Sequence, residues 1–210
     1  MANNNSDSIH EMKIGDILIK HENFEEITST QLYALSKDLV SESIPNEWRA
    51  VSATIQTNGI ATEDKKWKSN ASGNVYVSIV LPYDSCLFGE NPGLIMNDFA
   101  RKAVVKVLNP ILSQEGIEQA YIERQNDVMV NGKKICGVMT SIRDLEGSSF
   151  KQVIVGIGVN INMDEDYLSD VSQPATSLFI VTKKHFDHFP ILKQVIEGFT
   201  INYLEGAKQK

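Results

Sequence analysis

The segment KQVIVGIGVNINM, residues 151–163, restricts the fold more than any other part of the chain. It is almost wholly apolar and rich in β-branched residues, as a strand is when both faces of its sheet are covered. Asn131-Gly132 lies between two other apolar runs, and this pair is the strongest short-range signal for a β-hairpin. We therefore expect a sheet that contains a hairpin and has protein layers on both sides.

The remaining apolar runs predict the fold class. Further strands are expected at residues 48–56, 74–81, 119–123, 127–130 and 134–141. Helices are expected at residues 29–40, 93–114 and 189–203, where apolar side chains recur every three or four positions, with Asn109-Pro110 closing the second. Because strands outnumber helices and several are joined by hairpins, the chain is expected to be an α+β protein with a mainly antiparallel mixed sheet backed by helices.

Two segments are expected to lie outside the packed elements. Residues 1–23 are predicted to be a flexible tail, since the start of the chain is polar, and residues 24–210 to be a single domain. Residues 57–73 are polar and rich in turn residues, which predicts a long loop of the kind that usually carries function.

Charge and composition exclude several classes of protein. The chain has 20 Lys and Arg against 27 Asp and Glu, a formal net charge of −7, so bulk binding of nucleic acid is not expected. Cys86 and Cys136 are too few for a disulfide framework, and each lies in apolar sequence as a buried thiol would. No window approaches the ~18 apolar residues of a membrane span, and the start lacks the apolar core of a secretory signal. A cytoplasmic protein with no membrane contact is expected.

Five segments are difficult to explain by packing alone. They are residues 29–31, 56–69, 126–137, 156–162 and 173–178. Their order and spacing resemble the catalytic domain of biotin protein ligases over roughly residues 24–205. The resemblance implies the class II synthetase-like fold of biotin and lipoate ligases, here expected without an N-terminal helix-turn-helix and without a C-terminal SH3-like barrel.

The resemblance also implies an activity, an ATP-dependent biotin–protein ligase. Members of that family join the carboxylate of biotin to ATP, forming biotinyl-5′-AMP and pyrophosphate, and then transfer biotin to one lysine of a carrier domain. The ligands implied are biotin, ATP and Mg²⁺, and the protein partner is the biotin carboxyl carrier domain of a carboxylase. A homodimer formed edge to edge through the sheet is an assembly that the family allows.

Lys134 matches the family's catalytic lysine, which lies between the carboxylate and the α-phosphate. Its ammonium would offset the charge that develops during nucleotidyl transfer. Strand alternation would put Lys134 and Cys136 on one face of the hairpin and Gly137 on the other. Without the resemblance, a lysine in a hairpin is more simply interpreted as a solvated surface residue.

The other matches divide between the two ligands. The resemblance assigns biotin binding to Ser29, Thr30, Gln56, Gly59 and Gly137. It assigns binding of ATP or the adenylate to Thr62, Lys65, Trp67, Asn126 and Asn160. Asp127 is expected to act in catalysis, either by holding the Mg²⁺ that accompanies ATP or by orienting the acceptor lysine. Ser29 and Thr30 also suit simple helix capping, and Trp67 also suits an anchor for the loop.

Two stretches depart from the family pattern. The family's adenylate loop is rich in glycine and arginine, whereas residues 59–65 keep the first glycine and one basic residue. Thr62 takes the place of an arginine, and Glu63 and Asp64 add negative charge beside a phosphate site. Residues 123–125, Glu-Arg-Gln, replace Lys-Trp-Pro. Two alternatives therefore stay open, a catalytically degenerate pseudoenzyme that binds biotin or the carrier, and a lipoate or octanoate ligase of the same superfamily.

Overall fold

The structure, a computed structural model, describes residues 6–41, 43–62, 65–83, 85–89, 91–123, 126–145, 147 and 150–208. The side chains at positions 6–9 and 86 lie outside this description, so the buried thiol expected at Cys86 stays a prediction. Four residues that depart from the family pattern also lie outside it: Glu63, Asp64, Arg124 and Gln125.

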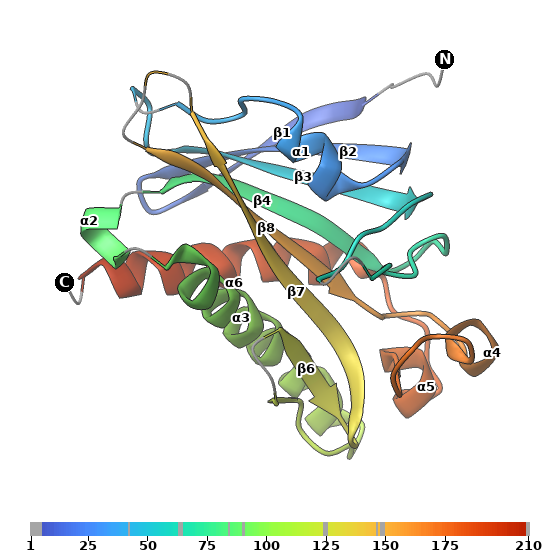
Figure 1. Cartoon of the computed structure of the whole chain (residues 1–210). Coiled ribbons are helices and arrows are strands. Elements are labelled where there is room, and N and C mark those ends of the chain that lie inside the picture. The colour runs from blue at the N-terminus through green and yellow to red at the C-terminus, as the bar shows by residue number, and fades with distance from the viewer. Residues whose placement is uncertain are drawn as a thin grey trace.

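The described strands form one sheet. In chain order they are β1 (Ser6–Ile14), β2 (Ile17–Ile27), β3 (Glu47–Gln56), β4 (Val75–Tyr83), β5 (Tyr121–Ile122), β6 (Asp127–Val130), β7 (Lys133–Asp144) and β8 (Lys151–Val159). Across the eight-stranded sheet the order is β1-β2-β3-β4-β8-β7-β6-β5 (Figure 1). β2 and β3 run parallel, whereas the other neighbouring strands pair antiparallel. The expected α+β class with a mixed, mainly antiparallel sheet is confirmed.

Two long helices cover one face of this sheet. The described helices are α1 (Thr30–Leu35), α2 (Ser85–Phe88), α3 (Pro92–Gln114), α4 (Glu165–Leu168), α5 (Leu178–Thr182) and α6 (His188–Lys208). Figure 1 shows α3 and α6 packed together against one face, with α1 on the other. Among these described helices, none combines the length and apolar character that crossing a membrane requires.

The central strands β4 and β8 are covered on both faces. Val77 and Val155 belong to the main core, which lies between the sheet and the two long helices. Val80 and Ile154 point to the opposite face, where they pack with Ala34 of α1. Burial on both sides explains the nearly continuous apolar sequence of these strands and confirms the expected layers.

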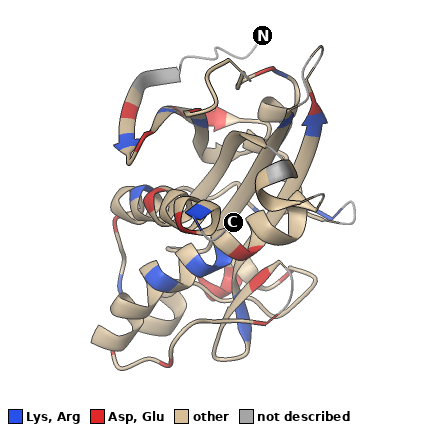
Figure 2. Cartoon of the chain, turned by 90° about the vertical axis from the view of Figure 1, so that its left-hand side faces the viewer, with Lys and Arg blue, Asp and Glu red and all other residues tan. Residues whose placement is uncertain are grey.

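Charged residues of both signs are interspersed over the described helices and strands (Figure 2). Several are paired locally: Lys20 of β2 lies 2.8 Å from Glu47 of β3, and Lys184 lies 2.7 Å from Glu115 at the end of α3. The described residues therefore carry positive and negative charges side by side and do not form the basic stripe that suits a nucleic-acid phosphate backbone.

The N-terminal segment belongs to the sheet, contrary to expectation. β1 and β2 form an antiparallel hairpin, and Gly15 in its turn has a φ of 60°. Ile17 and Ile19 are buried in the main core. The prediction of a flexible tail over residues 1–23 is therefore wrong from residue 6 onward. Met12 and Ile14 before Gly15, and Ile17 and Ile19 after it, alternate as strand residues do, and the polar residues around them hid this pattern.

Helix α1 begins as expected but ends early. Ser29 is its N-cap, and the Ser29 hydroxyl accepts a hydrogen bond from the Leu32 N–H at 3.4 Å. The helix stops at Leu35, where a distant side chain binds backbone groups on both sides of the helix end. Gln152 Nε2 donates to the Ala34 carbonyl at 3.0 Å, and Gln152 Oε1 accepts from the Leu39 N–H at 2.8 Å. The apolar residues among 36–40, although spaced as in a helix, therefore pack against the protein without forming one.

Helix α3 continues past the residue expected to close it. Pro110 lies within the helix, which runs on to Gln114. A proline there removes one backbone hydrogen bond. Leu112, two residues later, is fully buried in the main core, and its burial offsets that loss.

Candidate functional site

Two adjoining pockets lie on the face of the sheet opposite α3 and α6. The inner pocket lies between the start of α1 and strands β4, β7 and β8. The outer pocket, of about 850 Å³, lies between the loop after β3 and the segment from α4 to residue 175. The residues that line both pockets are Gln56, Ala61, Thr62, Trp67, Asn126 and Lys134. All of these except Ala61 were predicted from the sequence, and they form the junction between the pockets.

A hydrogen-bond network forms the polar end of the inner pocket. The Thr30 N–H and hydroxyl both point to Gln56 Oε1, at 2.8 and 3.2 Å. Ser78 Oγ lies 2.9 Å from Thr30 Oγ1 and 2.9 Å from Gln31 Oε1. Each hydroxyl carries one proton, so these two hydroxyl groups cannot donate in all three of their contacts at once. The network therefore has acceptor capacity left for an incoming N–H group.

A pair of glycines forms the floor between the two pockets. Gly137 of β7 lies opposite Gly158 of β8 in the sheet. A Cβ at Gly158 would lie 2.5 Å from the indole of Trp67, and one at Gly137 would lie 2.7 Å from it. Glycine within a strand often marks such a close approach. With the indole on this floor, the space left in the inner pocket is about 50 Å³.

The placement of Lys134 depends on a β-bulge that the sequence did not reveal. Met129 pairs with Lys134 and Val128 pairs with Cys136, so Ile135 is an extra residue in β7. Ile135 and Cys136 are both fully buried in the main core. The expectation that Lys134 shares a face with Cys136 is therefore wrong.

Instead, the bulge brings Lys134 to the same side as Gly137. A Cβ at Gly137 would lie 3.3 Å from Lys134 Nζ. Backbone contacts on the outer side support this arrangement: the Lys134 N–H donates to the Pro174 carbonyl at 2.9 Å, and the Thr176 N–H donates to the Lys134 carbonyl at 2.8 Å. The ammonium is consequently directed at the junction of the pockets.

The ammonium of Lys134 has an acidic partner. Lys134 Nζ lies 2.7 Å from Asp127 Oδ1, and it lies 5.4 Å from the centre of the Trp67 ring. The side chains of Lys134 and Asp127 are 17% and 11% exposed, so water screens the pair only partly. Beside them, Asn126 Oδ1 accepts from Asn97 Nδ2 at 2.8 Å. The cation is thus fixed in place and open to the pockets on one side.

A hairpin arm, residues 59–62 and 65–67, lies over the junction. Ile60 pairs with Lys66, and the Trp67 N–H donates to the Gly59 carbonyl at 3.0 Å. A Cβ at Gly59 would lie 2.5 Å from the Trp67 carbonyl, so glycine is needed where the two sides of the arm meet. Thr62 and Lys65 are exposed near its tip, and Lys65 lines the outer pocket.

Asn160 and Cys136 are both buried, but only Asn160 lies at the site. Asn160 lines the outer pocket, where its Nδ2 donates to the Thr176 carbonyl at 3.0 Å and so braces the wall. Burial raises the pKa of the Cys136 thiol to about 12, which suits an inert core residue and confirms that expectation.

Several residues at the site were given no role of their own from the sequence, although Gln31, Lys68 and Gly158 lie in segments that it singled out. Gln31, Ser78, Gly158 and Lys68 line the pockets, and Asn97 lies behind them as the donor to Asn126. Two of them carried a usable signal: Gly158 recurs two positions after Gly156 in an otherwise bulky strand, and Gln31 follows the helix cap directly. Lys68 and Asn97 become recognisable only through partners far away in the chain.

Comparisons with known proteins bear on this site. The family model described as "Biotin/lipoate A/B protein ligase family" matches residues 23–160. The chain is 30% identical over 178 residues to "Bifunctional ligase/repressor BirA" of Bacillus spizizenii, which covers 84% of this chain and 51% of that protein. The protein of the same name from Bacillus subtilis is 30% identical over 191 residues, covering 90% of this chain and 54% of that one.

A solved structure supports the same fold. The biotin protein ligase from Aquifex aeolicus, in complex with biotin and ATP, aligns with a TM-score of 0.69 at 23% identity. The alignment covers 90% of this chain and 72% of that one. The chain spans about half the length of the two BirA proteins that it matches.

Proposed function

Since the chain belongs to the biotin/lipoate A/B protein ligase family, we propose that it is an ATP-dependent biotin–protein ligase. Its reaction joins biotin and ATP into biotinyl-5′-AMP and pyrophosphate, and then transfers the biotinyl group to a lysine of a biotin carboxyl carrier domain. The observation that carries the proposal is the position of Lys134, at the junction of a small polar pocket and a large open one.

The inner pocket suits the ureido ring of biotin. A ureido group has two N–H donors and one carbonyl acceptor, and the network of Thr30, Gln31 and Ser78 has acceptor capacity to spare. Gln56 contributes an amide whose Nε2 lies beside Gly59. Because only about 50 Å³ is open in the inner pocket, entry of the ring requires side chains of its lining to move aside.

The outer pocket suits the nucleotide. Its lining includes the basic side chains of Lys65, Lys66, Lys68 and Lys134. A ligand carboxylate that extends from the inner pocket meets the α-phosphate beside Lys134. There the carboxylate oxygen attacks phosphorus, the bond to the β-phosphate oxygen breaks, and the ammonium offsets the charge that develops. Asn126 and Asn160 border the same space.

The described part of the chain offers few ligands for magnesium. Among the described residues there is no group of three or more His, Cys, Asp or Glu side chains that could hold a metal ion. The Asp127 carboxylate is engaged with Lys134. These residues do not fit a Mg²⁺ site built by the protein, although Mg²⁺ commonly accompanies ATP through its phosphates. We assign Asp127 instead to fixing the Lys134 ammonium.

A transfer assay tests the proposal. The chain is incubated with ATP, biotin and a biotin carboxyl carrier domain, and labelling of the carrier is read on a streptavidin blot. Labelling that requires both ATP and biotin is expected. Modification with lipoate or octanoate but not with biotin would assign the chain to the other branch of the family. Calorimetric binding of biotin with no AMP release would identify a pseudoenzyme.

A further inference from the structure

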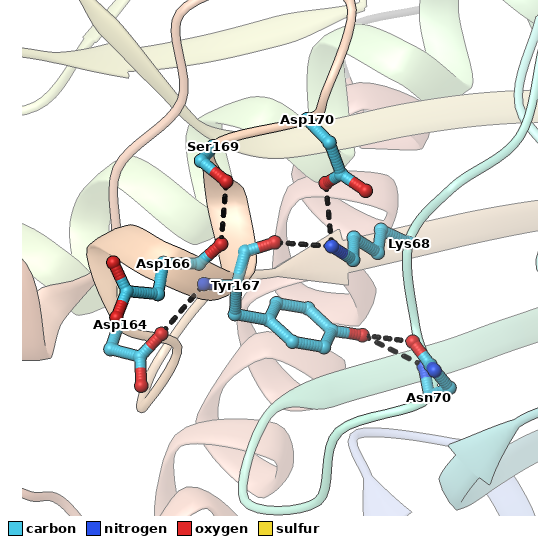
Figure 3. Close-up of polar contacts among 7 residues, drawn as sticks. All are labelled: Lys68, Asn70, Asp164, Asp166, Tyr167, Ser169 and Asp170. Atoms are coloured by element: carbon cyan, nitrogen blue, oxygen red, sulfur yellow. Dashed lines mark hydrogen bonds and ion pairs between the residues drawn. The ribbon is translucent and has the colours of Figure 1, made fainter.

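Lys68, the residue after Trp67, connects the arm to a distant part of the chain. Lys68 Nζ lies 2.6 Å from Asp170 Oδ1, and it donates to the Tyr167 carbonyl (Figure 3). The ammonium also lies 4.2 Å from the centre of the Tyr167 ring. One cation is therefore held by a carboxylate, a carbonyl and an aromatic face, all from the segment at and just after α4.

A second link lies two residues further along. The Asn70 N–H donates to the Tyr167 hydroxyl at 3.0 Å, and that hydroxyl donates to Asn70 Oδ1 (Figure 3). Tyr167 is itself fixed, since its N–H donates to Asp164 Oδ1 at 2.7 Å. We call Lys68, Asn70, Tyr167 and Asp170 together the clamp.

The clamp acts on the backbone that carries the Trp67 indole. Trp67 has a fixed residue on each side in the chain, because Lys68 is held by the clamp and Lys66 pairs with Ile60. The indole contacts the same apolar cluster as Tyr167, which contains Tyr76, Met163 and Leu168. Yet Trp67 Nε1 is buried without a hydrogen-bond partner among the described residues. A buried N–H without a partner is unfavourable by about 1–3 kcal/mol, so contacts elsewhere must hold the indole where it is.

We propose that Lys68 is a positioning residue whose clamp holds the Trp67 indole on the Gly137–Gly158 floor, and so closes the wall between the inner and outer pockets. This inference rests on the proposed function for its consequence: with the clamp broken, the wall opens more often and the bound adenylate escapes faster. The position of the indole itself can be measured without any catalysis.

The test compares Lys68→Met, which keeps the length of the side chain and removes its charge, with a matched control. The control is Lys183→Met, because Lys183 also pairs with the α4 segment, at 3.6 Å from Glu165, while no hydrogen bond or ion pair joins it to the arm among the residues that the structure describes. Accessibility of the indole is read by acrylamide quenching of tryptophan fluorescence. Trp48, the other tryptophan, is 1% exposed in the core, so a change in quenching reports on Trp67.

We expect the quenching constant of Lys68→Met to rise about two- to fivefold, while the control stays at the wild-type value. Asp170→Asn should raise it less, and the double variant should match Lys68→Met, because the two residues act through one contact. Release of biotinyl-5′-AMP should be about three- to tenfold faster in Lys68→Met.

Unchanged quenching in Lys68→Met would overturn the proposal. If quenching is unchanged and only ATP binding weakens, Lys68 acts by contacting phosphate and does not position the indole. If the chain proves to be inactive, the adenylate measurement fails for every variant. The quenching measurement still decides whether the clamp holds the indole, so the two failures are distinguishable.

Discussion

Replacing Lys134 separates a catalytic role for its ammonium from a structural one. A surface ion pair contributes about 0–1 kcal/mol, whereas removing one partner of a fully buried pair costs about 3–5 kcal/mol. The Lys134 and Asp127 side chains are 17% and 11% exposed, which places this pair between those limits. Lys134→Met leaves the Asp127 carboxylate unpaired and should lower the free energy of unfolding by about 2 kcal/mol, measured by urea unfolding.

The double variant Asp127→Asn/Lys134→Met removes both charges, so it should recover most of that stability. It should not recover activity: both variants are expected to form biotinyl-5′-AMP at least about a hundredfold more slowly, from radiolabelled ATP, because neither can offset the developing charge. Biotin binding by calorimetry should stay within about tenfold. Lys133→Met, on the exposed neighbour, is the control. A double variant that regains both stability and adenylate formation would refute the catalytic role.

Two further predictions address the floor and the sheet. Gly158→Ala places a Cβ 2.5 Å from the Trp67 indole, which also lines the outer pocket, and by displacing the indole it should weaken ATP binding by about 1–3 kcal/mol. Gly93→Ala, whose Cβ would lie 3.8 Å from Asn91 Oδ1, should leave ATP binding unchanged. Equal affinities of the two variants for ATP in calorimetry would argue against this floor. Burial and the nearby His10 lower the pKa of His21 from 6.5 to about 4, so the folded state favours the neutral ring. The stability that the neutral His21 ring contributes is fully present above pH 6.5 and is lost as the pH falls from 6.5 to about 4, by up to about 3 kcal/mol in urea unfolding. His21→Gln should flatten this dependence of the free energy of unfolding on pH. An equally steep fall in that variant would show that His21 is not its cause.

The parts of the fold that depend on neighbouring residues could be predicted from the sequence. Asn131 and Gly132 have φ angles of 50° and 72°, as the expected tight hairpin turn requires. β8 is apolar on both faces because both faces are covered. The junction residues were found because they recur in the order and spacing of a known family, which local patterning alone would not have supplied.

What could not be predicted depends on partners far along the chain. The bulge at Ile135 is stabilised where Lys134 turns its backbone toward residues 174–176, about forty positions away. Gln152 ends α1 through hydrogen bonds that span more than a hundred residues. The ion pair of Lys68 with Asp170 in the clamp likewise joins residues 102 positions apart. No period or local motif encodes such contacts, so the face on which Lys134 lies was predicted wrongly, although the residue does line both pockets.

The most direct test of the account is biotin-dependent exchange of radiolabelled pyrophosphate into ATP, measured with the chain alone. Exchange requires that an acid and ATP react reversibly at one site, which is what the two pockets meeting at Lys134 are proposed to allow. The account predicts exchange that is saturable in biotin, absent without it and lost in Lys134→Met. Exchange that needs no biotin, or none at saturating biotin and ATP, would contradict it.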